Sequence, residues 1–393
     1  MNFHFHPKSH RGLLSRAVTR VAALAFISLT AVPVSAETPL GLAVPAQYEY
    51  ELAMPGSTDH FLRPARVLVD SRTDEVYVAD PGHSRIVILD NHGLFKFEFS
   101  VSEYFGAPTD LAVNSEGFIF VLGSTREGKR VKVFDFDGRY IRDFSTDLEY
   151  PSVSITTIAI DADDRLYLLD ESRLQVLCYS MNGIFEFSFP LVSELDEKLR
   201  HETVFGSLAI HQGTIYVPIA TLGSIHLYDT KGNWIRAVGY KGSTIGELNF
   251  PISVAVSDDH IIHILDKHRH NVVCYSREGK LLGEFGGKGT HDGWFYHPEW
   301  IAVDNHHQVY IGQVFGSRVQ VCSLPDFIVD RNNQLHIEQI TQEDIQKSET
   351  ISTTQADRRW SLANSQSTSE TNHRSADAVE QNEASEGTIE KSQ

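Results

Sequence analysis

A sequence unit recurs six times along this chain of 393 residues. Its clearest copy, VYVADPGHSRIVILDNHG at residues 76–93, ends in a glycine that returns at the same place in later copies. These glycines are Gly93, Gly138, Gly183, Gly232 and Gly279, with Asp326 at the sixth position. A second marker, an apolar triplet followed by a polar residue, occurs at residues 67–69, 111–113, 158–160, 208–210, 254–256 and 301–303. Because the two markers stay in phase, the chain contains a tandem repeat.

Each copy consists of short stretches in which apolar and polar residues alternate, such as Arg165–Leu169 and Arg130–Phe134. This alternation is the period of half-buried strands, and no helical period interrupts it. Repeats of roughly 40 to 50 residues with four strands are typical of propeller blades, because one blade cannot bury its own faces. The sequence therefore predicts an all-β, six-bladed β-propeller of four-stranded antiparallel blades.

The closure of the ring can also be predicted. The first five units each end in an outer strand, at residues 95–99, 140–144, 184–188, 234–238 and 281–285, whereas the sixth unit has none. A segment of the same character, Tyr48–Leu52, precedes the first unit. We expect this N-terminal strand to complete the last blade by pairing beside Val321, which removes an exposed sheet edge.

The repeat resembles that of the NHL-repeat family of six-bladed propellers, in which a unit carries an Asp, a polar turn with Asn or His, and then Arg. Asp80, His83 and Arg85 match this pattern, and the resemblance covers about residues 46–326. It implies the propeller architecture of the family. The fourth unit at residues 218–224 and the fifth at residues 266–271 depart from the pattern, so their loops are expected to be differentiated.

Both ends of the chain differ from the repeats. Four basic residues, an apolar run at residues 21–32 and Val34-Ser35-Ala36 predict a signal peptide at residues 1–36, cleaved after Ala36. The protein is then periplasmic or secreted, without a transmembrane span; an uncleaved segment would tether it. Residues 327–340 are either an extra strand or a linker. Residues 341–393 form a polar acidic tail that we expect to be disordered, and its binding to a partner is an alternative.

Charge and cysteine content exclude several functions. The formal net charge of −18 repels nucleic-acid backbones and anionic lipids, so no nucleic-acid partner is expected, whereas basic protein partners are compatible. The three cysteines, Cys178, Cys274 and Cys322, fall in the third strands of different blades. They are expected to be small buried hydrophobes rather than metal ligands or disulfide partners.

A catalytic or metal site on a propeller would be expected where the inner strands begin, around the mouth of the central channel. The residues at these positions are Arg66, Asp110, Thr157, Ser207, Ser253 and Trp300. Related folds include zinc-dependent amidating lyases and calcium-dependent lactonase-like enzymes. The mouth offers one neighbouring histidine, His297, which is too few for zinc, and two carboxylates, Asp110 and Glu299. We expect no metal or other cofactor. Calcium, with Asp110, Glu299, His297 and Arg66 as catalytic residues, is the alternative.

The loop into the sixth blade is rich in aromatic residues, and Trp, Tyr and Arg often anchor protein interfaces. The predicted partner-binding residues are Trp294, Tyr296, His297, Trp300, His268, Arg269, His270 and Phe315. Some of these rings could instead plug the core between blades. The preferred interpretation is an exported, noncatalytic scaffold that binds a protein partner of the cell envelope through its channel-mouth loops. A metal-dependent lyase or lactonase-like enzyme is the alternative, and a spacer whose tail does the binding is a third.

Overall fold

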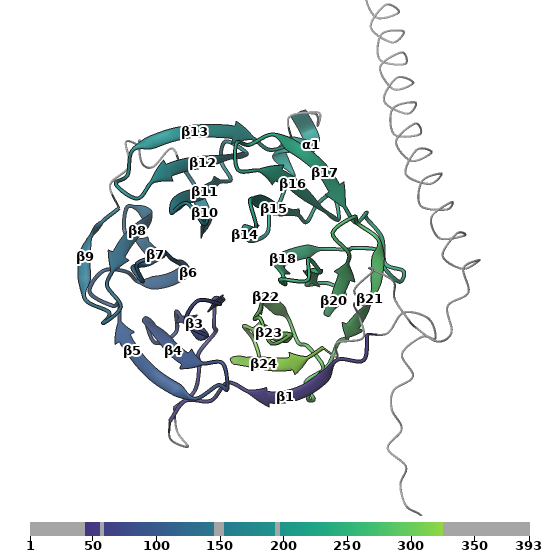
Figure 1. The fold of residues 1–393 in the computed structure, drawn as a ribbon, viewed down its shortest axis with the longest axis horizontal. Coiled ribbons are helices and arrows are strands. Elements are labelled where there is room, and N and C mark those ends of the chain that lie inside the picture. The colour runs from purple at the N-terminus through teal and green to yellow at the C-terminus, as the bar shows by residue number, and fades with distance from the viewer. Residues whose placement is uncertain (1–43, 56–58, 145–152, 193–196, 325–393) are drawn as a thin grey trace, which may run out of the picture. The chain divides into compact units, whose positions relative to one another are not determined.

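The computed structural model describes residues 44–55, 59–144, 153–192 and 197–324. Within these residues, six four-stranded antiparallel sheets stand around a central axis, as Figure 1 shows. The predicted all-β, six-bladed propeller is confirmed. The predicted signal peptide at residues 1–36, residues 327–340 and the tail at residues 341–393 lie outside the described residues.

Each blade runs outward from an inner strand that faces the axis. The first two blades are formed by β2 (Arg66–Asp70), β3 (Glu75–Asp80), β4 (Arg85–Asp90) and β5 (Phe95–Ser100), and by β6 (Ala107–Val113), β7 (Ile119–Thr125), β8 (Gly128–Phe134) and β9 (Tyr140–Asp143). The third and fourth are β10 (Ile155–Ile160), β11 (Arg165–Asp170), β12 (Gln175–Ser180) and β13 (Phe185–Pro190), and β14 (Ala209–His211), β15 (Thr214–Ile219), β16 (Ser224–Asp229) and β17 (Trp234–Val238). The fifth contains β18 (Pro251–Val256), β19 (Ile262–Asp266), β20 (Asn271–Tyr275) and β21 (Leu281–Gly286).

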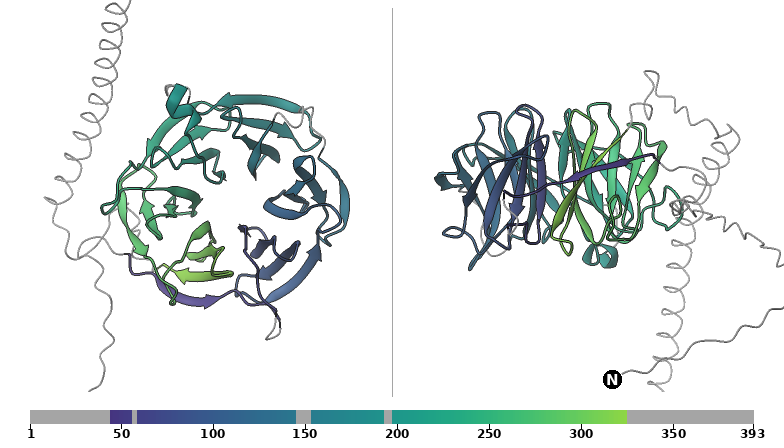
Figure 2. Two further views of the ribbon diagram at one scale, coloured as in Figure 1. Left: turned by 180° about the vertical axis from the view of Figure 1, so that it is seen from behind. Right: turned by 90° about the horizontal axis from the view of Figure 1, so that it is seen from below.

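The sixth blade joins the two ends of the ring. Its strands are β22 (Pro298–Val303), β23 (Gln308–Gln313), β24 (Arg318–Ser323) and the N-terminal β1 (Gln47–Glu51). Strand β1 pairs antiparallel with β24, and Tyr50 lies opposite Val321. Figure 2 shows β1, in purple, along the outside of this blade. The predicted closure by the early segment is therefore confirmed.

One short helix was not predicted. Helix α1 (Glu197–His201) lies between β13 and β14, and the Thr203 hydroxyl donates to the carbonyl oxygen of Leu199 at its end. A single helical turn is too short to show a helical period in the sequence. Within the described residues, no helix is long and apolar enough to cross a membrane.

Apolar side chains from adjacent blades form one cluster at each blade junction. At the ring closure, for example, Val76 and Val78 of the first blade pack with Tyr310 and Val319 of the sixth. Five equivalent clusters occupy the other junctions. Because each blade buries its faces only against its neighbours, its stability depends on the closed ring.

Two physical constraints favour glycine at the repeated position. Gly138 has a φ of +72°, which disfavours residues with a Cβ, and a Cβ there would lie 2.3 Å from Cγ of Phe99 on the preceding blade. Gly93 is similar, since a Cβ would lie 2.7 Å from Cε2 of Tyr50 in the closing strand. The glycine marker therefore records close contact between neighbouring blades as well as a turn.

The Asp of the repeat has a structural role. Asp80 is fully buried, and its carboxylate accepts hydrogen bonds from the Leu62 backbone at 2.8 Å and from Arg85 Nε at 2.9 Å, while Nδ1 of His83 lies 2.8 Å away. Asp266 in the fifth blade similarly accepts a hydrogen bond from the Phe250 backbone. This residue therefore anchors the loop that leads into its own blade.

Candidate functional site

The residues that begin the inner strands form a ring of contacts between blades. Arg66 Nε lies 3.2 Å from Asp110 Oδ1, and the Thr157 hydroxyl donates to Asp110 Oδ2 at 2.6 Å. Farther round, the hydroxyls of Ser207 and Ser253 are 2.8 Å apart. The remaining junctions are bridged by Leu208 N to Thr157 Oγ1, Ile301 N to Ser253 Oγ, and Arg66 over the Trp300 ring. The structure thus buries most of these residues in blade junctions instead of leaving them open at the mouth.

The carboxylates proposed for a metal site are engaged by protein groups. Asp110 is fully buried and also accepts hydrogen bonds from the backbone of Leu111 at 2.8 Å and Ile158 at 2.9 Å. Glu299 forms an ion pair with Lys267. In the described parts of the chain, no three His, Cys, Asp or Glu side chains gather as a metal site would require. Calcium needs several free oxygen ligands, so Asp110 and Glu299 do not fit it as they stand.

Four of the predicted partner-binding residues come together between the fifth and sixth blades. The ring of His297 lies 4.6 Å from Tyr296, 4.9 Å from Phe315 and 5.3 Å from His270, measured between centroids. We call Tyr296, His297, Phe315 and His270 the aromatic patch. Phe315 is 68% exposed and Tyr296 is 37% exposed, whereas His270 is buried, and burial lowers the pKa of its imidazole.

Hydrogen bonds hold the patch in place. The backbone N–H of Tyr296 donates to the fully buried Gln313 side chain at 2.8 Å, and that of His297 donates to His270 Nδ1 at 3.2 Å. His297 therefore has aromatic neighbours, and within the described residues it forms no ion pair with a carboxylate that would suit the enzyme alternative.

The other predicted partner-binding residues lie outside this group. His268 is exposed and stacks on Phe250 at 4.4 Å, and Trp294 lies over the backbone of Gly287 with 36% exposure. Arg269 is held by an ion pair with Glu284 at 2.8 Å. Trp300 stands apart from the patch, because it packs against Arg66 at the channel.

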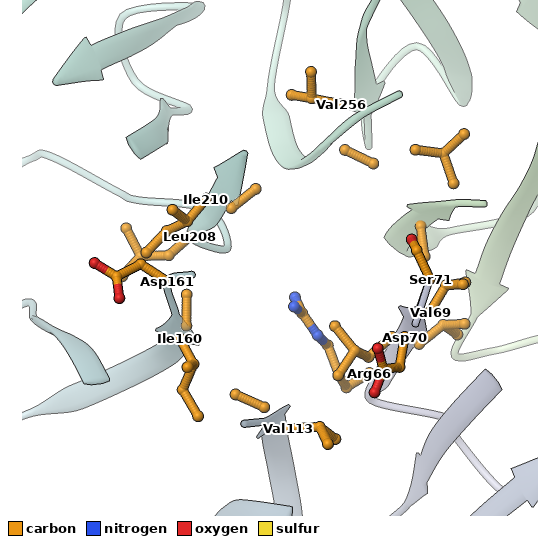
Figure 3. A pocket seen from close by; sticks show the side chains of 18 of the residues that line it. Arg66, Val69, Asp70, Ser71, Val113, Ile160, Asp161, Leu208, Ile210 and Val256 are labelled. Atoms are coloured by element: carbon orange, nitrogen blue, oxygen red, sulfur yellow. The ribbon is translucent and has the colours of Figure 1, made fainter. Parts of the chain in front are cut away.

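A cavity of about 500 Å³ occupies the centre of the ring, and Figure 3 shows it from close by. Its walls are the six inner strands, and the last residue of every apolar triplet belongs to its lining. These residues, which we call the aliphatic collar, are Val69, Val113, Ile160, Ile210, Val256 and Val303. The triplets are visible in the sequence as a phase marker, but only the closed ring shows that they enclose a cavity.

The six sheets, their order and the closing strand decide the architecture. The chain is a six-bladed β-propeller. It is similar in structure to a streptogramin B lyase, with 14% identity over 72% of this chain and 100% of the other, at a TM-score of 0.51. It is also similar to a protein of unknown function from Bacteroides thetaiotaomicron VPI-5482, with 13% identity over 68% of this chain and 71% of the other, at a TM-score of 0.53. No family model and no curated protein sequence matches the chain. At such identities the similarity shows the shared propeller fold alone.

Proposed function

We propose that this protein is an exported, noncatalytic propeller of the NHL type that binds a protein partner of the cell envelope through the aromatic patch. The supporting observation is that Phe315 and Tyr296 are exposed to solvent, while Gln313 and His270 accept hydrogen bonds from the backbone of the loop that carries Tyr296 and His297. Tyrosine and tryptophan are enriched among residues that dominate binding energy. A loop that is already ordered loses less conformational entropy when it binds.

The net charge of the chain favours some classes of partner over others. A formal net charge of −18 favours encounter with a basic or neutral protein surface and disfavours nucleic acid. His268 is exposed and Trp294 partly so, and both belong to loops that flank the patch. They would extend the contact area around Phe315 and Tyr296.

Crosslinking in cells, followed by capture of the protein and mass spectrometry, tests the proposal. The variant is Phe315→Ala combined with Tyr296→Ala, and the matched control is Phe136→Ala, whose side chain is 69% exposed on the second blade. We expect a specific partner to be lost only from the patch variant. Capture of the same partners by the wild type and the patch variant would contradict the proposal.

The alternative is a metal-dependent lyase or lactonase-like enzyme with Asp110, Glu299, His297 and Arg66 at the channel mouth. The streptogramin B lyase similarity makes this class worth testing, although Asp110 and Glu299 are paired with Arg66 and Lys267. Elemental analysis of the purified protein distinguishes the two proposals. Stoichiometric zinc or calcium that is lost in Asp110→Asn would favour the enzyme.

A further inference from the structure

The central cavity has the dimensions of a ligand site. Its volume of about 500 Å³ lies within the range of small-molecule sites, roughly 300–1,000 Å³. The aliphatic collar contributes one apolar side chain to the lining from each of the six inner strands. Water makes few hydrogen bonds to such a wall, so an apolar group that displaces it gains free energy.

Two cationic residues, Arg66 and Arg72, line this cavity. Arg66 is only 8% exposed, and Figure 3 shows its guanidinium group extending from the wall toward the middle of the cavity. Its Nε is 3.2 Å from Asp110 Oδ1, but the geometry is that of an ion pair, and Nε makes no hydrogen bond within the described residues. The ring of Trp300 covers the guanidinium at 4.9 Å.

The unused hydrogen-bonding capacity of Arg66 lies in its terminal nitrogens, because Nε is buried against Asp110 and neither terminal nitrogen donates a hydrogen bond within the described residues. The Asp110 carboxylate already accepts three hydrogen bonds from Leu111, Thr157 and Ile158, so it does not depend on the guanidinium for its donors. A guanidinium presents two parallel N–H groups to a carboxylate, which is its preferred anionic partner together with phosphate.

Two of the carboxylates that line the cavity are paired with arginines, and a third accepts a hydrogen bond from a backbone N–H. Asp70 is held by Arg72 Nε at 2.8 Å, and Asp161 is held by Arg165 at 2.7 Å. Asp164 accepts a hydrogen bond from the Ser115 backbone at 2.8 Å. Arg72 is held by Asp70 and the Asn114 carbonyl oxygen, whereas Arg66 meets Asp110 through Nε alone. The terminal nitrogens of Arg66 are therefore the cationic donors in the lining that can receive an anion.

We propose that the channel binds a small apolar monocarboxylate, with its carboxylate on the Arg66 guanidinium and its hydrocarbon body against the aliphatic collar. The rise of roughly 3.3 Å per strand residue places Val69 about 10 Å along β2 from Arg66, which suits a body of the length of octanoate. A single available cation and a net charge of −18 disfavour multiply charged anions such as nucleotides. This site is separate from the aromatic patch and does not depend on the proposed partner.

Calorimetric titration of the purified protein with octanoate tests this proposal, with octanamide as the uncharged probe of the same shape. We expect octanoate to bind with a stoichiometry of one and octanamide to bind at least about tenfold more weakly, because it lacks the charge-assisted hydrogen bonds. Arg66→Gln should weaken octanoate binding to a similar extent. Arg126→Gln, the same change at an exposed turn residue, should leave it unchanged.

A second variant separates loss of the site from loss of the fold. Ile210→Gln places a polar group in the collar without touching Arg66 or Asp110, and it should weaken octanoate binding while thermal unfolding of the free protein stays cooperative. The absence of octanoate binding to the wild type at millimolar concentration would overturn the proposal. Equal affinity for octanoate and octanamide, or for the wild type and a folded Arg66→Gln or Ile210→Gln variant, would also overturn it.

Discussion

The hydroxyl group of Tyr50 donates a hydrogen bond of 2.8 Å to the carbonyl oxygen of Asn91. Tyr50 belongs to β1, which completes the sixth blade, and Asn91 lies in the turn between β4 and β5 of the first blade. The bond therefore crosses the junction at which the ring closes. The same hydroxyl lies 3.1 Å from Oε1 of Gln308, which belongs to the sixth blade.

Removing this hydroxyl should weaken the closure. We expect Tyr50→Phe to lower the free energy of unfolding by about 1 kcal/mol, because the Asn91 carbonyl oxygen then keeps only the longer hydrogen bond of 3.4 Å from the Tyr310 hydroxyl. Urea denaturation monitored by tryptophan fluorescence measures the change. Tyr48→Phe is the matched control on the same strand, since no hydrogen bond of the Tyr48 hydroxyl is found in the described structure, and equal losses in both variants would refute the prediction.

The repeat glycines offer a test of blade packing. Gly138 and Gly213 have nearly the same φ, +72° and +73°, but a Cβ on Gly138 would meet Phe99 whereas one on Gly213 would meet nothing within 4 Å. Gly213→Ala should therefore cost only about 1 to 2 kcal/mol for the left-handed backbone. Gly138→Ala should cost a further 1 to 3 kcal/mol or so, because Phe99 must move. Similar unfolding free energies for the two variants would show that this contact does not constrain the residue.

The buried histidine His263 should make the protein sensitive to acid. Burial, with a smaller contribution from the charge of His307, lowers the pKa of His263 from 6.5 to about 3. The unfolded chain therefore binds a proton that the folded chain excludes, so stability is lost as the pH falls below about 6.5. At pH 5 this amounts to about 2 kcal/mol.

Unfolding free energies at pH 7.5 and pH 5 provide the measurement. We expect His263→Phe, which removes the titrating group from its site beside Cys274, to lose about 2 kcal/mol less than the wild type over this range. His92→Phe alters an exposed histidine and should retain the wild-type pH dependence. A pH dependence that is the same in all three proteins would contradict the assignment.

The three cysteines should be unreactive in the folded protein. All are free and buried, and burial raises the pKa of Cys178 and of Cys322 to about 12 and raises that of Cys274 further. Since the thiolate is the reactive form, alkylating reagents should modify none of them at neutral pH and all three after denaturation. Thiol titration with and without denaturant counts them, and rapid labelling of the native protein would show the prediction to be wrong.

The architecture could be predicted because its signals are local. The alternation in Arg165–Leu169 predicts a strand, and β11 (Arg165–Asp170) contains it. The segment Tyr48–Leu52 belongs to no unit, and the sixth unit lacks an outer strand. The sequence therefore indicated that this segment is the outer strand of the sixth blade, and β1 takes that position. Helix α1 escaped prediction because five residues do not establish a period.

The candidate site was only partly predictable. The sequence showed that residues 294–297 are rich in aromatic side chains. In the structure, Tyr296 stacks on His270 and His297 contacts Phe315. Trp300 and Arg269 were expected in the same patch but pack against Arg66 and Glu284. A loop sequence shows which side chains are available, whereas their direction depends on the blade that receives them.

The sequence by itself determined the number of blades, their strand order and the segment that closes the ring. The alternation of apolar residues and the turn glycines mark the strands of each unit, and the recurrence of the unit gives the number of blades. Only the tertiary structure decided that Asp110 accepts a hydrogen bond from Thr157, 47 residues away, and forms an ion pair with Arg66 of the preceding blade. Such partners lie about one blade apart in sequence, and their geometry exists only when neighbouring blades have packed around the axis.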